Sequence, residues 1–280
     1  METLPAGREL AKARFATLAT LATLAMLALF SPSDGHTICM IFVLDCHMVL
    51  RRFVASCIVL FAASAVLAKD FWEEPFEKWT REQVLRMLSD SPWAQSETFT
   101  GAIDSKDAGM AGEKELYYRF TARFFSALPV REAYVRMARL MNNYDQMAPD
   151  QRQEFDKRFQ RALNLEVAER VIVAVDYSTN DPNTARDLRS AFELATADTL
   201  KQRVYLISQK LGRIELREYF PPSADGTGAK LIFPRTANGQ PIFGPQDKEI
   251  RFDFTAPVTN QRIFLTFKSA KMVYRGELNY

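Results

Sequence analysis

The sequence predicts an α+β fold, in which N-terminal helices and a β-hairpin are followed by an antiparallel β-sheet or sandwich. Before residue 166 apolar side chains recur mostly at helical spacing, whereas after residue 167 short runs rich in β-branched and aromatic residues follow one another. Turn signals that contain glycine separate these runs. We therefore expect a helix-rich region with a β-hairpin over 69–166 and an antiparallel β-rich region over 167–280, which together can form one domain.

Residues 48–68 have the composition of a secretory signal peptide. Two arginines stand near the start, about a dozen apolar residues follow, and Val66-Leu67-Ala68 places small residues before a cut ahead of Lys69. We therefore expect an extracytoplasmic protein, periplasmic or secreted. Contact with a membrane is expected only through an uncleaved leader.

Residues 1–47 form an upstream leader with two interpretations. The apolar run Phe15–Phe30 is either a genuine first membrane segment or part of a leader translated from a start codon placed too early, with Met48 as the natural initiator. The run has 16 residues, and a spanning helix needs roughly 20. Its length favours the second interpretation.

Every cysteine and every histidine lies before Lys69, at Cys39, Cys46, Cys57, His36 and His47. Taking the first 68 residues from 280 leaves 212, a length that buries enough apolar surface to fold without disulfides. These 212 residues carry 31 basic and 30 acidic side chains. This balance gives no reason to expect a nucleic acid as the partner.

The absence of histidine and cysteine after Lys69 excludes several chemistries from that part of the chain. It cannot form a Ser-His-Asp triad, a cysteine nucleophile or a usual zinc site, and it has no G-x-S-x-G or G-x-x-x-x-G-K motif. Gly226-Thr227-Gly228 lacks the third glycine of a nucleotide-binding loop and is interpreted as a turn. We expect no cofactor and no metal; carboxylate chemistry is what remains.

An arm dense in aromatic residues, 71–79, opens the chain after the signal peptide. Thr80 and Gln83 then have the spacing of a capping box, which predicts a helix that Pro92 ends. The residues expected on the buried side of this helix are Val84, Leu85, Met87 and Leu88.

Trp79-Thr80 and Ser91-Pro92-Trp93-Ala94 bracket this helix. With these motifs the chain resembles a family of secreted bacterial proteins, mostly from acidobacteria, that has no assigned activity. The stretches 126–133, 175–180 and 245–248 are also similar to that family, so the resemblance spans most of Lys69 to Tyr280. It implies a secreted domain and no catalytic residue.

The middle of the chain predicts a hairpin and two helices. Residues 96–103 and 115–126 read as paired strands with a long loop containing glycine. A helix begins at Pro129, with one apolar stripe formed by Val130, Tyr134, Met137, Met141 and Tyr144. A second helix covers 150–163 and is expected to bury Phe155, Phe159, Ala162 and Leu163. Acidic residues are mixed among the basic ones on its other face, so we interpret that face as solvated.

The remaining chain predicts mostly strands. Residues 171–175 are almost continuously apolar, as in a strand buried on both faces. Asp181-Pro182 offers a helix cap followed by a proline at the first helical position. Turn signals stand at Asp225-Gly226 and Asn238-Gly239. Further strands are expected at 204–208, 213–220, 230–234, 249–254, 263–268 and 271–278.

Five residues are candidates for ligand binding. Asp176 and Asp181 follow a buried strand and precede a helix, although capping by Asp181 and a turn hydrogen bond by Asp176 are the interpretation we favour. Trp72, Trp79 and Trp93 could form a platform on which a sugar stacks. Packing of these rings beside the amphipathic helix is favoured for them as well.

Two classes of function fit these features. The favoured one is a non-catalytic binding or structural module outside the cytoplasm, whose partner is a protein or a cell-envelope component. The alternative is a carboxylate-dependent hydrolase acting on glycans, which requires two carboxyl groups held about 5 to 9 Å apart. The absence of catalytic motifs favours the module.

Overall fold

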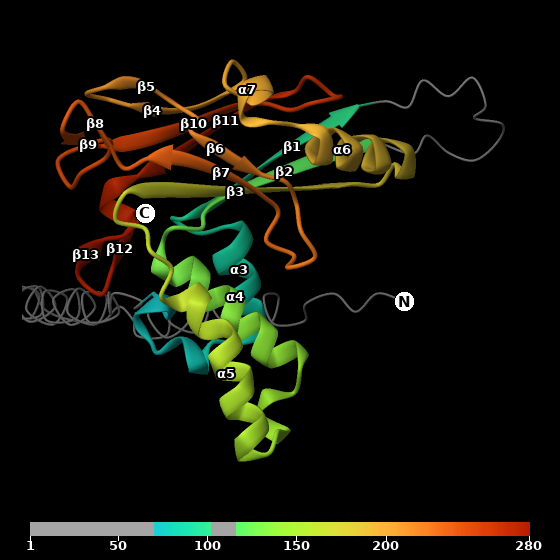
Figure 1. Ribbon diagram of the computed structural model, residues 1–280, viewed down its shortest axis with the longest axis vertical. Coiled ribbons are helices and arrows are strands. Elements are labelled where there is room, and N and C mark those ends of the chain that lie inside the picture. Colours follow the sequence, from blue (N-terminus) through green and yellow to red (C-terminus); the bar gives the residue numbers. More distant parts are fainter. Residues whose placement is uncertain (1–69, 102–115) are drawn as a thin grey trace, which may run out of the picture. The chain divides into compact units, whose positions relative to one another are not determined.

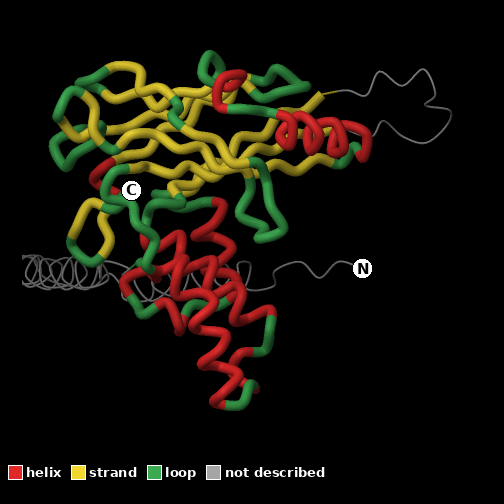
Figure 2. Tube along the Cα trace, in the orientation of Figure 1, coloured by secondary structure: helices red, strands yellow, loops and turns green. Residues whose placement is uncertain are grey.

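Antiparallel sheets and helices make up the described part of the protein, which is an α+β fold, as the sequence predicts. The computed structural model describes residues 70–101 and 116–280, which belong to one compact unit, Lys69–Tyr280. Figures 1 and 2 show the strands of the larger sheets gathered in one part of the structure, with α3 (Arg81–Ser89), α4 (Leu128–Met141) and α5 (Pro149–Leu163) on one side of them. The expected leader and signal peptide lie outside the described residues.

Two larger sheets contain most of the described strands. The first has the order β1-β2-β3-β7-β6, with strands Ala94–Gly101, Leu116–Phe124, Arg170–Thr179, Ala229–Pro234 and Glu218–Phe220. The second has the order β11-β10-β4-β5, with strands Arg262–Lys268, Glu249–Thr255, Val204–Ser208 and Gly212–Glu215. All neighbouring strands in both sheets are antiparallel. Because β1 and β2 share a sheet with β3 and β7, the helix-rich and β-rich regions are joined by hydrogen bonds.

The two sheets face each other across an aromatic core. Phe120 and Phe124 lie on the same face of β2 and point to the second sheet, where their rings meet Phe254 at 6.4 Å and Phe267 at 4.8 Å between centroids. All four rings are at most 1% exposed. Successive side chains of a strand point to opposite faces. Arg123 therefore lies on the opposite face of β2, where its guanidinium donates to the Leu88 carbonyl of α3 and the Tyr134 hydroxyl of α4.

Side chains join the two sheets where their edge strands β1 and β11 lie beside each other. Gln95 donates from Nε2 to the carbonyl oxygen of Thr266 at 2.7 Å, and Glu97 accepts from the backbone N–H of Phe264 at 3.0 Å. Side chains therefore replace a backbone ladder between these strands.

Helix capping follows the sequence patterns closely. Thr80 and Gln83 form the expected capping box at the start of α3. Asp181 accepts from the backbone N–H of Thr184 at 2.9 Å, and Pro182 occupies the first turn of α6 (Pro182–Leu194). The other helical segments are η1 (Phe71–Glu73), η2 (Phe76–Lys78), η3 (Tyr144–Gln146), α7 (Ala197–Leu200) and η4 (Ser269–Lys271).

The predicted buried faces of α3 and α4 are wrong in part. Leu85 is 50% exposed and Met141 is 72% exposed. Met141 ends α4, and Asn143 then adopts a left-handed backbone with φ 51°, so Tyr144 lies in η3 and cannot continue the stripe. The residues of α4 that are buried are Pro129, Val130, Arg131, Glu132, Ala133 and Val135. The expected burial along α5 is also reduced, since of its residues only Phe155 is buried.

Two predicted strands are also corrected. The run 213–220 divides into β5 and β6, which belong to different sheets. The run 271–278 forms the end of η4 and a hairpin of β12 (Val273–Tyr274) and β13 (Glu277–Leu278), because Arg275 and Gly276 turn the chain with φ 52° and 86°. The turn at Asn238-Gly239 is confirmed, with φ 53° and 73° between β8 (Thr236–Ala237) and β9 (Gln240–Pro241).

Among the helices of residues 70–101 and 116–280, none has the length and apolar character that a membrane crossing requires.

Candidate functional site

A tight turn follows α3 and places Pro92 and Trp93. The backbones of Ser91 and Ala94 exchange hydrogen bonds of 2.9 and 3.2 Å. The Ser91 hydroxyl donates to the carbonyl of Met87 at 2.8 Å and accepts from the N–H of Trp93 at 3.2 Å. Serine thus ties the end of the helix to the turn, while the proline ring is left at the surface and the indole enters the core.

The Trp93 ring connects three segments that are distant in sequence. It is 0% exposed, and its Nε1 donates to the carbonyl of Asn279 at 2.6 Å. Its ring makes edge contacts with Trp72 of the aromatic arm at 5.6 Å and with Tyr274 of β12 at 6.2 Å between centroids. One buried ring therefore positions both the arm and the C-terminal hairpin.

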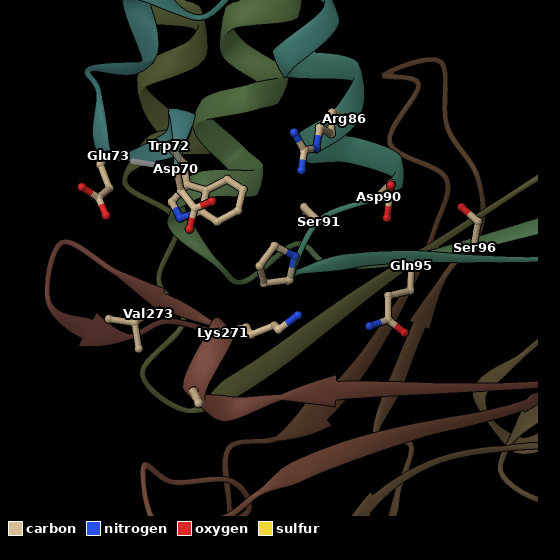
Figure 3. Close-up of a pocket in the computed structure, with 12 residues that line it drawn as sticks. Asp70, Trp72, Glu73, Arg86, Asp90, Ser91, Gln95, Ser96, Lys271 and Val273 are labelled. Carbon is tan, nitrogen blue, oxygen red and sulfur yellow. The ribbon is translucent and has the colours of Figure 1, made fainter. Parts of the chain in front are cut away.

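Around this junction lies a pocket of about 730 Å³, which we call the arm pocket. Three segments line it: the arm, the end of α3 with the turn into β1, and η4 with β12. Figure 3 shows Trp72 and Asp70 on one side, Asp90 on the other, and Arg86 and Lys271 between them above and below. Its volume is in the usual range for small-ligand sites.

The charged groups of the arm pocket are mostly unpaired. Within the residues that the structure describes, the side chains of Arg86, Lys271, Asp70 and Asp90 make no ion pair and no hydrogen bond; Arg86 only lies over the Phe71 ring at 5.8 Å. Charges elsewhere in the described fold are more often paired; the Arg262 guanidinium, for example, donates two hydrogen bonds of 2.6 and 3.0 Å to the Asp253 carboxylate. The pocket therefore presents donors and acceptors that a ligand can use.

Trp79 and Trp93 do not form a stacking platform. They are 1% and 0% exposed, since the Trp79 indole donates to the carbonyl of Glu74 at 3.1 Å and packs edge-on against Phe71 at 5.6 Å. The packing interpretation holds for these two rings. Trp72 is half-buried and alone of the three lines the arm pocket.

The candidate carboxylates Asp176 and Asp181 have structural partners and lie outside the arm pocket. Asp181 caps α6, and hydrogen bonds from the hydroxyl and N–H of Thr184 hold the pKa of its carboxyl below the usual value. Asp176 accepts from the N–H of Tyr177 at 2.9 Å and lies 3.5 Å from the guanidinium of Arg123. The structure brings neither of them to Trp72.

A buried network holds the C-terminal wall of the arm pocket. Glu132 of α4 is 4% exposed and accepts from the Tyr274 hydroxyl and, at 2.8 Å, from the Arg275 guanidinium. The side chain of Asn279 accepts from the N–H of Leu128 at 2.6 Å. Residues 274–279 are thus fixed on α4. Burial raises the pKa of the Glu132 carboxyl, and the hydrogen bonds and the charge of Arg275 offset this only in part.

Replacing Glu132 with glutamine is expected to change how stability depends on pH. Because the pKa is raised, at a pH between the two pKa values the folded state still holds a proton that the unfolded state has lost. The contribution of Glu132 to the free energy of unfolding is therefore fully present below the unfolded pKa, and it declines as pH rises through the folded pKa. Glu132→Gln removes that decline. In urea denaturation from pH 4 to 8, the free energy of unfolding of the variant should rise relative to that of the wild type as pH rises. A difference between the two that stays constant with pH would contradict this.

The arm pocket offers hydrogen-bonding groups, carboxylates and one aromatic ring. Within the described residues no group of three or more Asp, Glu, His or Cys could hold a metal ion. Comparisons of the chain with protein-family models, curated proteins and solved structures found no match. The site is therefore interpreted from its own geometry.

Proposed function

We propose that the chain is a non-catalytic binding module that works outside the cytoplasm, with the arm pocket as its ligand site. The observation that carries this proposal is a set of four charged side chains around the half-buried ring of Trp72 that have no ion-pair or hydrogen-bond partner among the described residues. Single unpaired charges are common on a solvated surface. A concave site in which several converge beside an aromatic ring is typical of ligand recognition.

The proposed partner is a component of the cell envelope, because the sequence of residues 48–68 predicts a signal peptide for export. Export is expected to remove everything up to Ala68. N-terminal sequencing of the exported protein should begin at Lys69, and a membrane-bound product that begins at Met1 would contradict the proposal.

Arginine variants on one helix test the site. Arg86 lines the arm pocket and Arg81 does not, although both are exposed residues of α3. Envelope material from the producing cell should be retained by the immobilised wild type and by Arg81→Ala. It should be retained at least about tenfold less by Arg86→Ala, because a hydrogen bond to a charged group contributes about 1.5–3 kcal/mol. Equal retention by both variants would rule out the arm pocket.

A carboxylate-dependent glycan hydrolase is the alternative proposal. Asp70 and Asp90 line different sides of the arm pocket (Figure 3), as an acid and a base would. Release of new reducing ends from a bound glycan by the wild type, but not by Asp90→Asn, would favour the hydrolase over the module.

A further inference from the structure

The charges of the arm pocket narrow the class of ligand. Its lining carries two cations, Arg86 and Lys271, and three carboxylates, from Asp70, Glu73 and Asp90. A ligand of a single charge sign would meet like charges on at least one side, which is unfavourable. An apolar ligand would cover these charges without hydrogen bonds, at a large desolvation cost.

A neutral ligand rich in groups that both donate and accept hydrogen bonds avoids the like-charge repulsion and the desolvation cost. A hydroxyl donates to a carboxylate and accepts from an ammonium or guanidinium group with the same oxygen. Several hydroxyls on one small scaffold can therefore use the Asp70 and Asp90 carboxylates together with Arg86 and Lys271. This is the pattern of a polyol or sugar.

Trp72 adds an apolar face with a fixed orientation. Its ring is held by edge contacts with Phe71 at 5.0 Å and 75° and with Trp93 at 5.6 Å and 87°. The face of an indole carries negative charge density, which attracts the weakly positive C–H groups on one side of a pyranose ring. Pro92 lies in the same lining and offers a second small apolar surface.

From these features we propose that the arm pocket binds a short neutral oligosaccharide, with one sugar ring stacked on Trp72 and its hydroxyls hydrogen-bonded to Arg86, Lys271, Asp70 and Asp90. This inference rests on the proposed function and specifies its ligand. Trp93 acts as a positioning residue, since it contacts Trp72 from the core and does not reach the ligand.

Calorimetric titration of the exported chain with neutral tetrasaccharides tests the inference. The probes are cellotetraose, maltotetraose and the tetramer of N-acetylglucosamine, and at least one is expected to bind. Trp72→Ala should weaken that binding about tenfold, and Trp72→Phe, which keeps an aromatic face, should weaken it less. Lys271→Ala should also weaken it, whereas Arg81→Ala should leave it unchanged. Binding should alter the fluorescence of the wild type and alter it much less in Trp72→Phe, because Trp79 and Trp93 are buried.

The experiments distinguish an error in the proposed class of ligand from an error in the proposed site. If none of the neutral probes binds, the inference is overturned, and retention of envelope material that still depends on Arg86 would leave the proposed function intact. Binding of a peptide or of an acidic glycan in place of the neutral probes, lost in Lys271→Ala, also overturns the inference alone. Tetrasaccharide binding that Trp72→Ala and Lys271→Ala leave unchanged overturns the assignment of the arm pocket to sugars.

Discussion

Trp93→Ala is expected to lower the free energy of unfolding by about 3–5 kcal/mol, as for other large aromatic truncations in a core. The side chain is 0% exposed, and its removal leaves a cavity at the junction of the arm, α3 and β12. The carbonyl of Asn279 would also lose the indole N–H that it accepts at 2.6 Å. Urea denaturation at pH 7 measures the change, and an unaltered midpoint would contradict the packing described for this ring.

Three further variants separate the sources of this loss. Trp93→Phe keeps a ring but lacks the N–H donor, so it should cost less than Trp93→Ala. Trp79→Ala should cost about 3–5 kcal/mol, since that ring is 1% exposed. Trp72→Ala should cost clearly less than either, because Trp72 is only half-buried. Equal costs at Trp72 and Trp93 would mean that the arm is more deeply packed than the structure has it.

Gly228→Ala is expected to destabilise the fold by about 2–5 kcal/mol, the sum of a left-handed backbone cost and local overpacking. Gly228 has φ +85°, and an added Cβ would overlap the carbonyl oxygen of Val175 and lie 2.9 Å from its carbon. Both of these atoms belong to the backbone of β3, so no side chain can move aside.

Gly226→Ala is the matched control for this variant. Gly226 lies two residues earlier with φ +69°, and a Cβ there would have no atom within 4 Å. It should cost only the backbone term of about 1–2 kcal/mol. The two variants share a turn and a substitution, so the difference between their unfolding midpoints isolates the clash. No difference would mean that β7 can shift away from β3.

Local patterns predicted the parts of the fold that local chemistry determines. The Thr80–Gln83 capping box, the Asp181 cap and the buried strand 171–175 depend on residues within a few positions of one another, and all three are present. Strand boundaries were less accurate where a strand changes sheets, as at 213–220. The partner that decides such a change lies elsewhere in the chain.

The burial of Arg131 and Glu132 could not be predicted in this way. Arg131 is 5% exposed and donates to the carbonyl of Leu163 at 2.8 Å at the end of α5, whereas Glu132 is satisfied by the hairpin at the C-terminus. Charged residues are interpreted as solvated unless a partner is known. Both partners here are at least 30 positions away, so the apolar pattern of α4 alone could not indicate that Arg131 and Glu132 are buried.

The arm pocket itself was not predicted; among its lining residues, only Trp72 was a candidate for ligand binding. Its other main groups, Arg86, Lys271, Asp70 and Asp90, are single charges without motif spacing, and they share a site because Trp93 links segments nearly 200 positions apart. For Asp181 the favoured interpretation is confirmed, since it caps α6. Asp176 was expected after the buried strand, but it lies within β3, where its carboxylate accepts from the N–H of Tyr177.

The side-chain bonds between β1 and β11 have a consequence for self-association. An exposed edge strand offers its backbone N–H and C=O groups to strands of other molecules, which is a common start of aggregation. At this edge Glu97 already occupies the amide of Phe264, and Gln95 already occupies the carbonyl of Thr266. A foreign strand would have to displace both before it could pair with β11, so these two bonds oppose the addition of strands from other molecules at this edge.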